Sequence, residues 1–204
     1  MLYLCSALDD AEESRNDLPR ALICAEWCKQ GLRACGQGDL MKILGVDPGT
    51  VATGYGVVER RNGVLRHLDH GVIRTSSKDS LWVRLGVIHA GIQAVLQAHQ
   101  PDALSLERCF VSRNVQSALK LGHARGAIMV AAVAQGLDVA EYTPGQIKLA
   151  VTGRGRAEKA QVQEMVRVIL SLTKSAPEDA SDALAAAICH LNGESFAGRL
   201  EPAR

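Results

Sequence analysis

Residues 41–49, Met-Lys-Ile-Leu-Gly-Val-Asp-Pro-Gly, decide the fold class more than any other stretch of this sequence. Ile43 to Val46 is a short apolar run of the kind that forms a buried strand, and Pro48-Gly49 is a turn signal. Asp47 stands where the strand ends, which is where sites in α/β folds tend to lie. Taken alone, Asp47 could equally well hydrogen-bond its own turn.

Strand and helix signals alternate through the rest of the chain. The predicted strands span residues 43–46, 54–59, 64–74, 103–106 and 139–142, with the Asn62-Gly63 hairpin turn between the second and third. The predicted helices span residues 81–97, 115–135, 145–151, 158–172 and 179–191. Three strands in hairpin order followed by strand–helix units predict an α/β fold with a mixed five-stranded sheet flanked by helices. This is the order of the ribonuclease H-like fold, although many other α/β folds fit it nearly as well.

Residues 1–40 differ in charge from the rest of the chain. They hold four Lys/Arg and seven Asp/Glu, a net charge of −3, whereas residues 41–204 hold nineteen and fifteen, a net charge of +4. We expect translation to begin at Met41, with residues 1–40 as a start-site artefact; the alternative is a genuine, poorly ordered extension. The intact mass of the native protein distinguishes the two. Residues 41–192 form the predicted domain, and residues 193–204 a predicted C-terminal tail.

The six cysteines indicate a reduced compartment rather than a disulfide framework. Cys5, Cys24, Cys28 and Cys35 are loosely spaced and form no pair at a zinc-site interval, while Cys109 and Cys189 lie in apolar surroundings. No secretory signal is evident, and the longest apolar runs fall far short of the roughly 20 residues that cross a bilayer. We therefore expect a cytoplasmic protein that makes no membrane contact.

Four carboxylates form the candidate site: Asp47, Glu107, Asp179 and Asp182. Glu107 closes the short apolar strand 103–106. If that strand lies parallel to the first, both carboxylates emerge at the same sheet edge. Asp179 and Asp182 are three residues apart at the start of a predicted helix, so they share one face.

Carboxylates brought together in this way resist ionisation unless a cation neutralises them. Oxygen ligands suit Mg²⁺, with Mn²⁺ as a substitute. Two such ions about 3.5–4 Å apart could activate water and stabilise the leaving oxygen of a phosphodiester. Singly, each signal is weak: Asp179 could be a helix N-cap, and Asp182 a solvated helix residue. Glu107 is harder to dismiss, because charge rarely ends an apolar strand without a partner.

Several longer strings are more specific than the carboxylates. They are Gly45-Val46-Asp47-Pro48-Gly49, Thr53-Gly54-Tyr55-Gly56, Glu107 followed by Phe110, Ser117 to Gly122, Ala124-Arg125-Gly126, Ala157-Glu158-Lys159 and Asp179 to Ala185. On these strings, residues 41–192 resemble the RuvC family of bacterial Holliday junction resolvases. The resemblance implies a ribonuclease H-like fold, a homodimer and Mg²⁺-dependent, symmetric paired nicks across a four-way DNA junction in recombination and repair.

The resemblance also implies roles for individual residues. The four carboxylates fall on the family's metal-binding catalytic positions, and Phe110 on its aromatic residue near the junction centre, where a ring can stack on bases. Lys148 and Lys159 match basic positions associated with DNA binding, and Lys159 also with catalysis. Further candidate phosphate contacts are Arg113, Lys120, Arg154 and Arg156. The alternative for Phe110 is ordinary packing in the core. The alternative for the basic residues is a solvated surface position without a role in DNA binding.

Three alternatives to a junction resolvase stay open. An RNA-directed nuclease would use the same carboxylates, and a non-catalytic junction-binding protein would not need them. An actin-like ATPase also begins with strand, Asp and Gly, but it needs two such domains. By resemblance, the expected partners are four-way junction DNA, a second copy of the chain, the junction-binding protein RuvA and the branch-migration ATPase RuvB. The expected dimer contact is the helix predicted at residues 115–135.

Overall fold

The structure is a computed structural model that describes residues 40–108 and 115–200, with side chains described to residue 193. These residues lie within one compact unit of the chain. The strands are β1 (Leu40–Asp47), β2 (Ala52–Arg61), β3 (Val64–Arg74), β4 (Ala103–Glu107) and β5 (Asp138–Tyr142). The helices are α2 (Leu81–His99), α3 (Val115–Val133), α4 (Pro144–Thr152), α5 (Lys159–Ile169) and α6 (Glu178–Leu200).

The five strands form one mixed sheet in the order β3-β2-β1-β4-β5. Strand β1 pairs antiparallel with β2 and parallel with β4, and β4 pairs parallel with β5. The Asn62-Gly63 turn has positive φ at both residues, 54° and 76°, as a tight hairpin between β2 and β3 requires. The predicted mixed five-stranded sheet is therefore confirmed.

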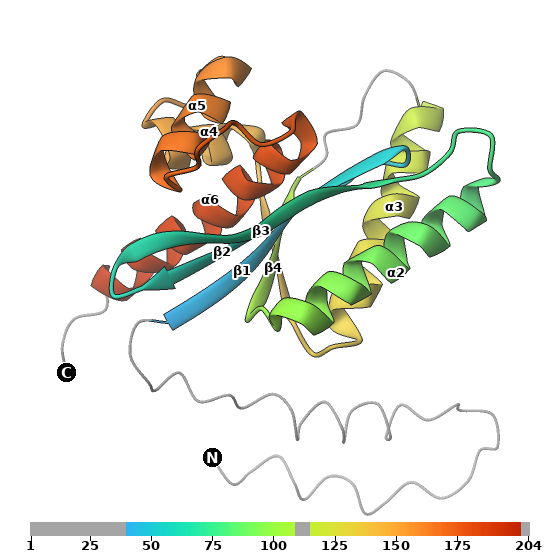
Figure 1. Cartoon of the computed structure of the whole chain (residues 1–204), viewed down its shortest axis with the longest axis horizontal. Coiled ribbons are helices and arrows are strands. Elements are labelled where there is room, and N and C mark those ends of the chain that lie inside the picture. Colours follow the sequence, from blue (N-terminus) through green and yellow to red (C-terminus); the bar gives the residue numbers. More distant parts are fainter. Residues whose placement is uncertain (1–39, 109–114, 201–204) are drawn as a thin grey trace, which may run out of the picture. The chain divides into compact units, whose positions relative to one another are not determined.

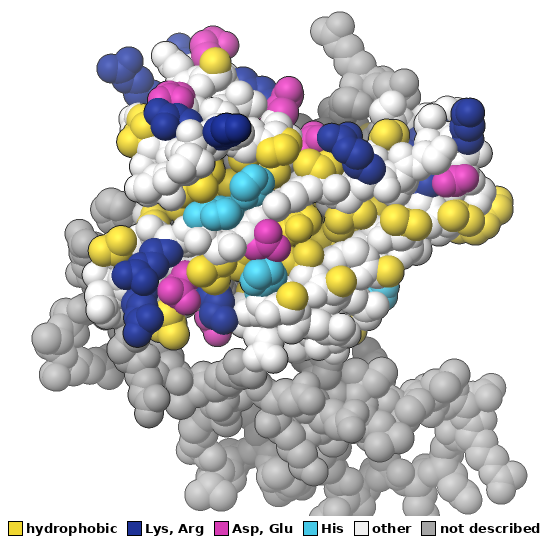
Figure 2. Space-filling view, viewed as in Figure 1, with side chains coloured by type: hydrophobic (Ala, Val, Ile, Leu, Met, Phe, Trp, Pro, Cys, Tyr) yellow, Lys and Arg dark blue, Asp and Glu magenta, His cyan; other side chains and the backbone are white. Residues whose placement is uncertain are grey.

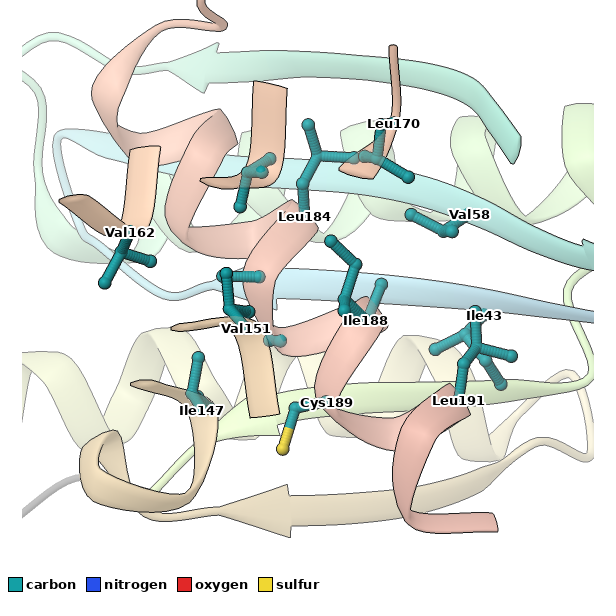
Figure 3. Close-up of a cluster of buried hydrophobic side chains, with 14 of the residues drawn as sticks. Ile43, Val58, Ile147, Val151, Val162, Leu170, Leu184, Ile188, Cys189 and Leu191 are labelled. Carbon is teal, nitrogen blue, oxygen red and sulfur yellow. The ribbon is translucent and has the colours of Figure 1, made fainter. Parts of the chain in front are cut away.

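Helices cover both faces of the sheet, so that two apolar clusters form the core (Figure 1). On one face, Ile43 of β1 and Val58 of β2 pack against α4, α5 and α6, and Figure 3 shows Leu184 and Ile188 of α6 pointing into this cluster. On the other face, Leu44 and its neighbours pack against α2 and α3. Because the side chains of β1 alternate between the two clusters, β1 is buried on both faces.

The helix boundaries differ from the predicted ones at the C-terminal end of the domain. Helix α5 ends at Ile169, three residues before the predicted end, because Ser171 adopts a left-handed φ of 52° and turns the chain. Helix α6 continues to Leu200, beyond the helix end predicted at residue 191. The small side chains of α6, many of them alanines, sustain helix over this length.

Of the helices that the structure describes, α2 has the length and the apolar composition that would allow a helix to cross a membrane. Its side chains Ile88, Ile92, Val95 and Leu96 are buried in the cluster shared with α3 and the sheet. A helix that buries one face in this way has the packing of a core helix.

Candidate active site

Asp47 and Glu107 lie at one edge of the sheet because the strands that carry them are parallel neighbours. Val46 of β1 pairs with Leu106 of β4, and each acidic residue follows directly in its strand. Both carboxylates are half-buried. The prediction that the two strands are adjacent and parallel is confirmed.

Helix α6 lies almost directly on β1 and β2, because glycines leave room for its backbone. A Cβ atom at Gly45 would overlap the carbonyl oxygen of Ala183, and one at Gly54 would overlap that of Asp179. Gly54 also pairs with Asp47 across the β1–β2 ladder. The N-terminal turn of α6 is therefore held beside Asp47. No role was predicted for these glycines, although their alternation with apolar residues in the strands was an available signal.

The turn after Asp47 is fixed by a buried threonine. The Thr53 hydroxyl donates to the Gly49 carbonyl oxygen at 2.6 Å, and the Gly49 amide lies 3.4 Å from the same hydroxyl. Thr53 is fully buried. This local clamp holds the end of β1, and hence Asp47, in one position.

Asp47 carries the strongest electrostatic signature of the site. The pKa of its carboxyl group is raised to about 7, first by burial and then by the nearby charges of Asp182, Glu107 and Asp179, against a lowering by Lys159. The other three predicted carboxylates are therefore all close enough to Asp47 to act on it electrostatically. Burial and Asp182 likewise raise the pKa of Glu107, whereas Lys159, Lys148 and Arg125 oppose that rise.

Lys159 joins the N-termini of α5 and α6 through two ion pairs. Its Nζ lies 2.6 Å from Glu178 Oε1 and 2.9 Å from Asp182 Oδ2. Burial lowers the pKa of Lys159, but these two carboxylates outweigh that effect and raise it above its ordinary value. Lys159 is therefore a fixed positive charge beside the acidic cluster. Glu178 was not among the predicted site residues.

Arg125 of α3 holds the backbone at the end of β4. Its guanidinium donates to the main-chain carbonyl oxygen of Glu107 and to the carboxylate of Glu141 on β5. The Ser105 hydroxyl ties the same strand to α6 by donating to the Ala186 carbonyl oxygen at 2.8 Å. No role was predicted for Arg125, because a pairing across three elements cannot be foreseen from one sequence.

The donor set fits a hard divalent cation. Every acidic side chain at the site offers oxygen ligands, and the raised pKa of Asp47 reflects a repulsion that a cation would relieve. Among the described residues, no three His, Cys, Asp or Glu side chains are already drawn together closely enough to hold a metal ion. Asp182 instead pairs with Lys159. Metal binding by the four carboxylates stays a prediction.

The other predicted DNA contacts lie on α3, on α4 and between α4 and α5. Lys148 is half-buried on α4, close enough to Glu107 to affect its pKa. Arg154 and Arg156 are exposed in the segment between α4 and α5, and Lys120 is exposed on α3. Phe110 and Arg113 lie outside the described residues. The DNA-binding roles of all these residues stay predictions.

Cys189 is a free, buried thiol, as its apolar surroundings predicted.

Comparison with known proteins shows to which family the chain belongs. The sequence profile described as "Crossover junction endodeoxyribonuclease RuvC" matches residues 43–190. The chain belongs to the RuvC family. A RuvC relative from Geotalea uraniireducens is 50% identical over 161 residues, which are 79% of this chain and 94% of that relative. Another, from Syntrophotalea carbinolica, is 53% identical over 150 residues, which are 74% of this chain and 93% of that relative.

A solved RuvC structure agrees with the chain in fold. The Thermus thermophilus RuvC in complex with a Holliday junction substrate is 38% identical, has a TM-score of 0.74, and is matched over 77% of this chain and 96% of its own. The fold of this RuvC family member is therefore the ribonuclease H-like fold, as predicted.

Proposed function

We propose that this chain is a structure-selective endodeoxyribonuclease that resolves four-way DNA junctions in recombination and repair. One observation carries the proposal: a half-buried Asp47, beside Glu107, Asp179 and Asp182, lies at the carboxyl end of β1 in a RuvC family fold. A non-catalytic protein gains nothing from keeping these carboxylates together, since their repulsion destabilises the fold.

The four carboxylates are the residues that would hold Mg²⁺, with Mn²⁺ as a substitute and two ions in each site. When bound, such ions lower the pKa of water and stabilise charge on a phosphodiester. The chain itself orients the ligands: the Thr53 clamp fixes Asp47, and Arg125 fixes the backbone of Glu107. Lys159, already beside Asp182, places a positive charge where negative charge develops on the phosphate.

Paired nicks require two sites related by a twofold axis, which a homodimer supplies. Helix α2 exposes large apolar side chains at Trp82 (76% exposed), Val83 and Val87. Helix α3, the predicted contact, exposes Leu119 and Val130. Apolar groups of this size on a surface favour association, so we place the dimer contact on α2 and α3. Heterodimers of wild-type and Asp47→Asn subunits should nick one strand only; free cutting of both strands would contradict one site per strand.

Replacement of Asp182 by Asn distinguishes the remaining alternatives. If the chain is a resolvase, Asp182→Asn abolishes junction cleavage and leaves junction binding intact. If it is a scaffold protein, the wild type does not cleave, and the variant binds junctions as the wild type does. Cleavage of RNA in preference to a DNA junction would identify an RNA-directed nuclease.

We further propose a cytoplasmic location and action beside RuvA and RuvB, as is expected of the family. Pull-down of the purified chain with either protein on junction DNA tests the partnership.

A further inference from the structure

A groove separates β3 from the turn that comes after α5, away from the acidic site. Its volume is about 740 Å³. Its lining includes apolar residues of both segments, and its polar side chains include Arg66, His67 and His70 of β3 and Ser171, Thr173 and Lys174 of the turn. No acidic residue lines it within the described part of the chain. Figure 2 shows this side of the molecule, with histidine side chains gathered on it. Cationic and hydroxyl-bearing side chains together are the chemistry that recognises phosphate.

A β-bulge brings the two histidines of the groove together. Residues three apart in a regular strand point to opposite faces, but the β2–β3 register shifts between Val57 and Val58. As a result His67 and His70 lie on the same face, with Nε2 of His67 2.7 Å from Nδ1 of His70. Asp69, between them, bonds instead to His99 of α2 on the other face. The bulge thus keeps the carboxylate out of the groove.

The opposite wall of the groove contains a strained residue. Ser171 has a φ of 52°, a conformation that glycine adopts at much lower cost at the end of a helix. The turn is held by hydrogen bonds from the Ser171 amide to the Val168 carbonyl oxygen (3.1 Å) and from the Leu172 amide to that of Arg167 (2.9 Å). These hydrogen bonds hold Ser171 in the left-handed conformation and so fix the position of its side chain. The Ser171 side chain is exposed in the groove wall.

We propose that this groove binds the sugar–phosphate backbone of a junction arm, away from the scissile phosphate. Arg66 and Lys174 supply the charge, and the histidine pair and Ser171 supply hydrogen bonds. This inference rests on the proposed function, because it assigns a second contact for the same DNA.

The sheet register gives the distance between the groove and the acidic site. Asp47 pairs with Gly54, two ladder rows from the His70 row and four rows from the His67 row, and β3 lies two strands from β1. At ~3.3 Å per row and ~4.8 Å per strand, the separation is about 12–16 Å. Phosphates on one strand of a duplex advance ~3.4 Å along its axis. Because the phosphates also rotate about that axis, their straight-line separation grows faster than this rise, so the groove reaches a phosphate only a few nucleotides from the cut.

The test measures junction binding with Ca²⁺ in place of Mg²⁺, so that cleavage does not enter. The variant Arg66→Gln/Lys174→Gln should bind a four-way junction about tenfold more weakly at ~100 mM salt, with a log Kd–log salt slope smaller by up to about 1.8. The matched control Arg61→Gln/Lys78→Gln removes the same charge from exposed residues outside the groove. Equal affinities for the two variants would overturn the groove contact and leave the proposed function standing.

Neutral methylphosphonates in the DNA locate the contact. A methylphosphonate is moved one position at a time through the few nucleotides that flank the cut. At one position it should weaken binding of the wild type without further weakening binding of Arg66→Gln/Lys174→Gln. If the methylphosphonate weakened binding of the wild type and of the variant by the same factor, the assignment would be contradicted. Histidine ring NMR shifts on adding inorganic phosphate, with none on adding junction, would assign the groove to a small anion instead. Failure of the wild type to bind any junction would overturn the proposed function as well.

Discussion

Gly54 of β2 and Asp179 of α6 are in backbone contact: the Asp179 carbonyl oxygen occupies the place where a Cβ on residue 54 would be. The acidic site depends on this contact, because it sets how closely α6 approaches Asp47. A substitution at Gly54 should therefore impair cleavage by displacing one pair of carboxylates from the other.

The variant Gly54→Ala tests that dependence. The added methyl group forces α6 away from the sheet, with an expected loss of about 1–3 kcal/mol in the free energy of unfolding and at least about 100-fold in cleavage rate. Gly193→Ala on α6 is the control, since its Cβ would meet only the Tyr142 hydroxyl at 3.9 Å. Urea unfolding and single-turnover cleavage measure the two effects. Full cleavage by a folded Gly54→Ala protein would refute the role of the contact.

The raised pKa of Asp47 predicts that the metal-free protein becomes less stable as pH rises. The folded protein holds the Asp47 proton up to a pH of about 7, whereas the unfolded chain releases it near 3.8. Between these values the folded state binds more protons, so this group lowers stability progressively with rising pH, by about 4 kcal/mol at most above pH 7. Asp47→Asn removes that slope.

Urea unfolding in EDTA from pH 4 to pH 8 measures the slope. The wild type should lose stability relative to Asp47→Asn across this range, and the variant should be the more stable protein at pH 8. Addition of Mg²⁺ should stabilise the wild type and leave the variant nearly unchanged. Parallel pH profiles for the two proteins would show that Asp47 is not held among other negative charges.

Lys159 and Glu178 form an ion pair in which only the lysine is expected to matter for cleavage. Lys159→Met removes the positive charge beside Asp182 and should slow single-turnover cleavage about 100-fold. Glu178→Gln removes the negative charge of the pair but keeps the lysine, and both side chains of that pair are more than half exposed, so stability should change little. Equal loss of activity in the two variants would mean that the ion pair itself, rather than the lysine charge, supports the reaction.

Arg125 is a positioning residue for Glu107. Arg125→Met removes the donor to the Glu107 carbonyl oxygen and leaves Glu141 unpaired, with an expected cost of about 1–3 kcal/mol in unfolding free energy. Looser placement of Glu107 should also raise the Mn²⁺ dissociation constant about tenfold, measured by calorimetry without DNA. Glu141→Gln keeps the contact to Glu107 and serves as the control. Unchanged Mn²⁺ affinity in a folded Arg125→Met protein would count against this role.

The sequence predicts those parts of the fold that depend on local pattern. Apolar runs and the Asn62-Gly63 turn located all five strands, and β3 matched residue for residue. The ends of α5 and α6 were missed for different reasons. A serine stands at the left-handed position that ends α5, where a glycine would have signalled the stop. Helix α6 continues to Leu200 through Asn192-Gly193, a pair that often marks a turn.

The site was predictable as a set of residue types but not as a set of contacts. Strand ends and helical spacing identified the four carboxylates, because those patterns are local. The glycine contacts with α6 and the hydrogen bond from Arg125 to Glu107 join residues far apart in the chain. The bulge that brings His67 beside His70 arises from the pairing of β3 with β2. Only the folded arrangement reveals them.

Cleavage of a labelled synthetic four-way junction in Mg²⁺, beside linear duplex and the Asp47→Asn variant, is the decisive test of the proposed function. We expect symmetric paired nicks in the junction alone, which are lost in the variant although the junction is still bound. Intact junction with wild-type protein in both Mg²⁺ and Mn²⁺, or equal cutting by Asp47→Asn, would contradict the proposal.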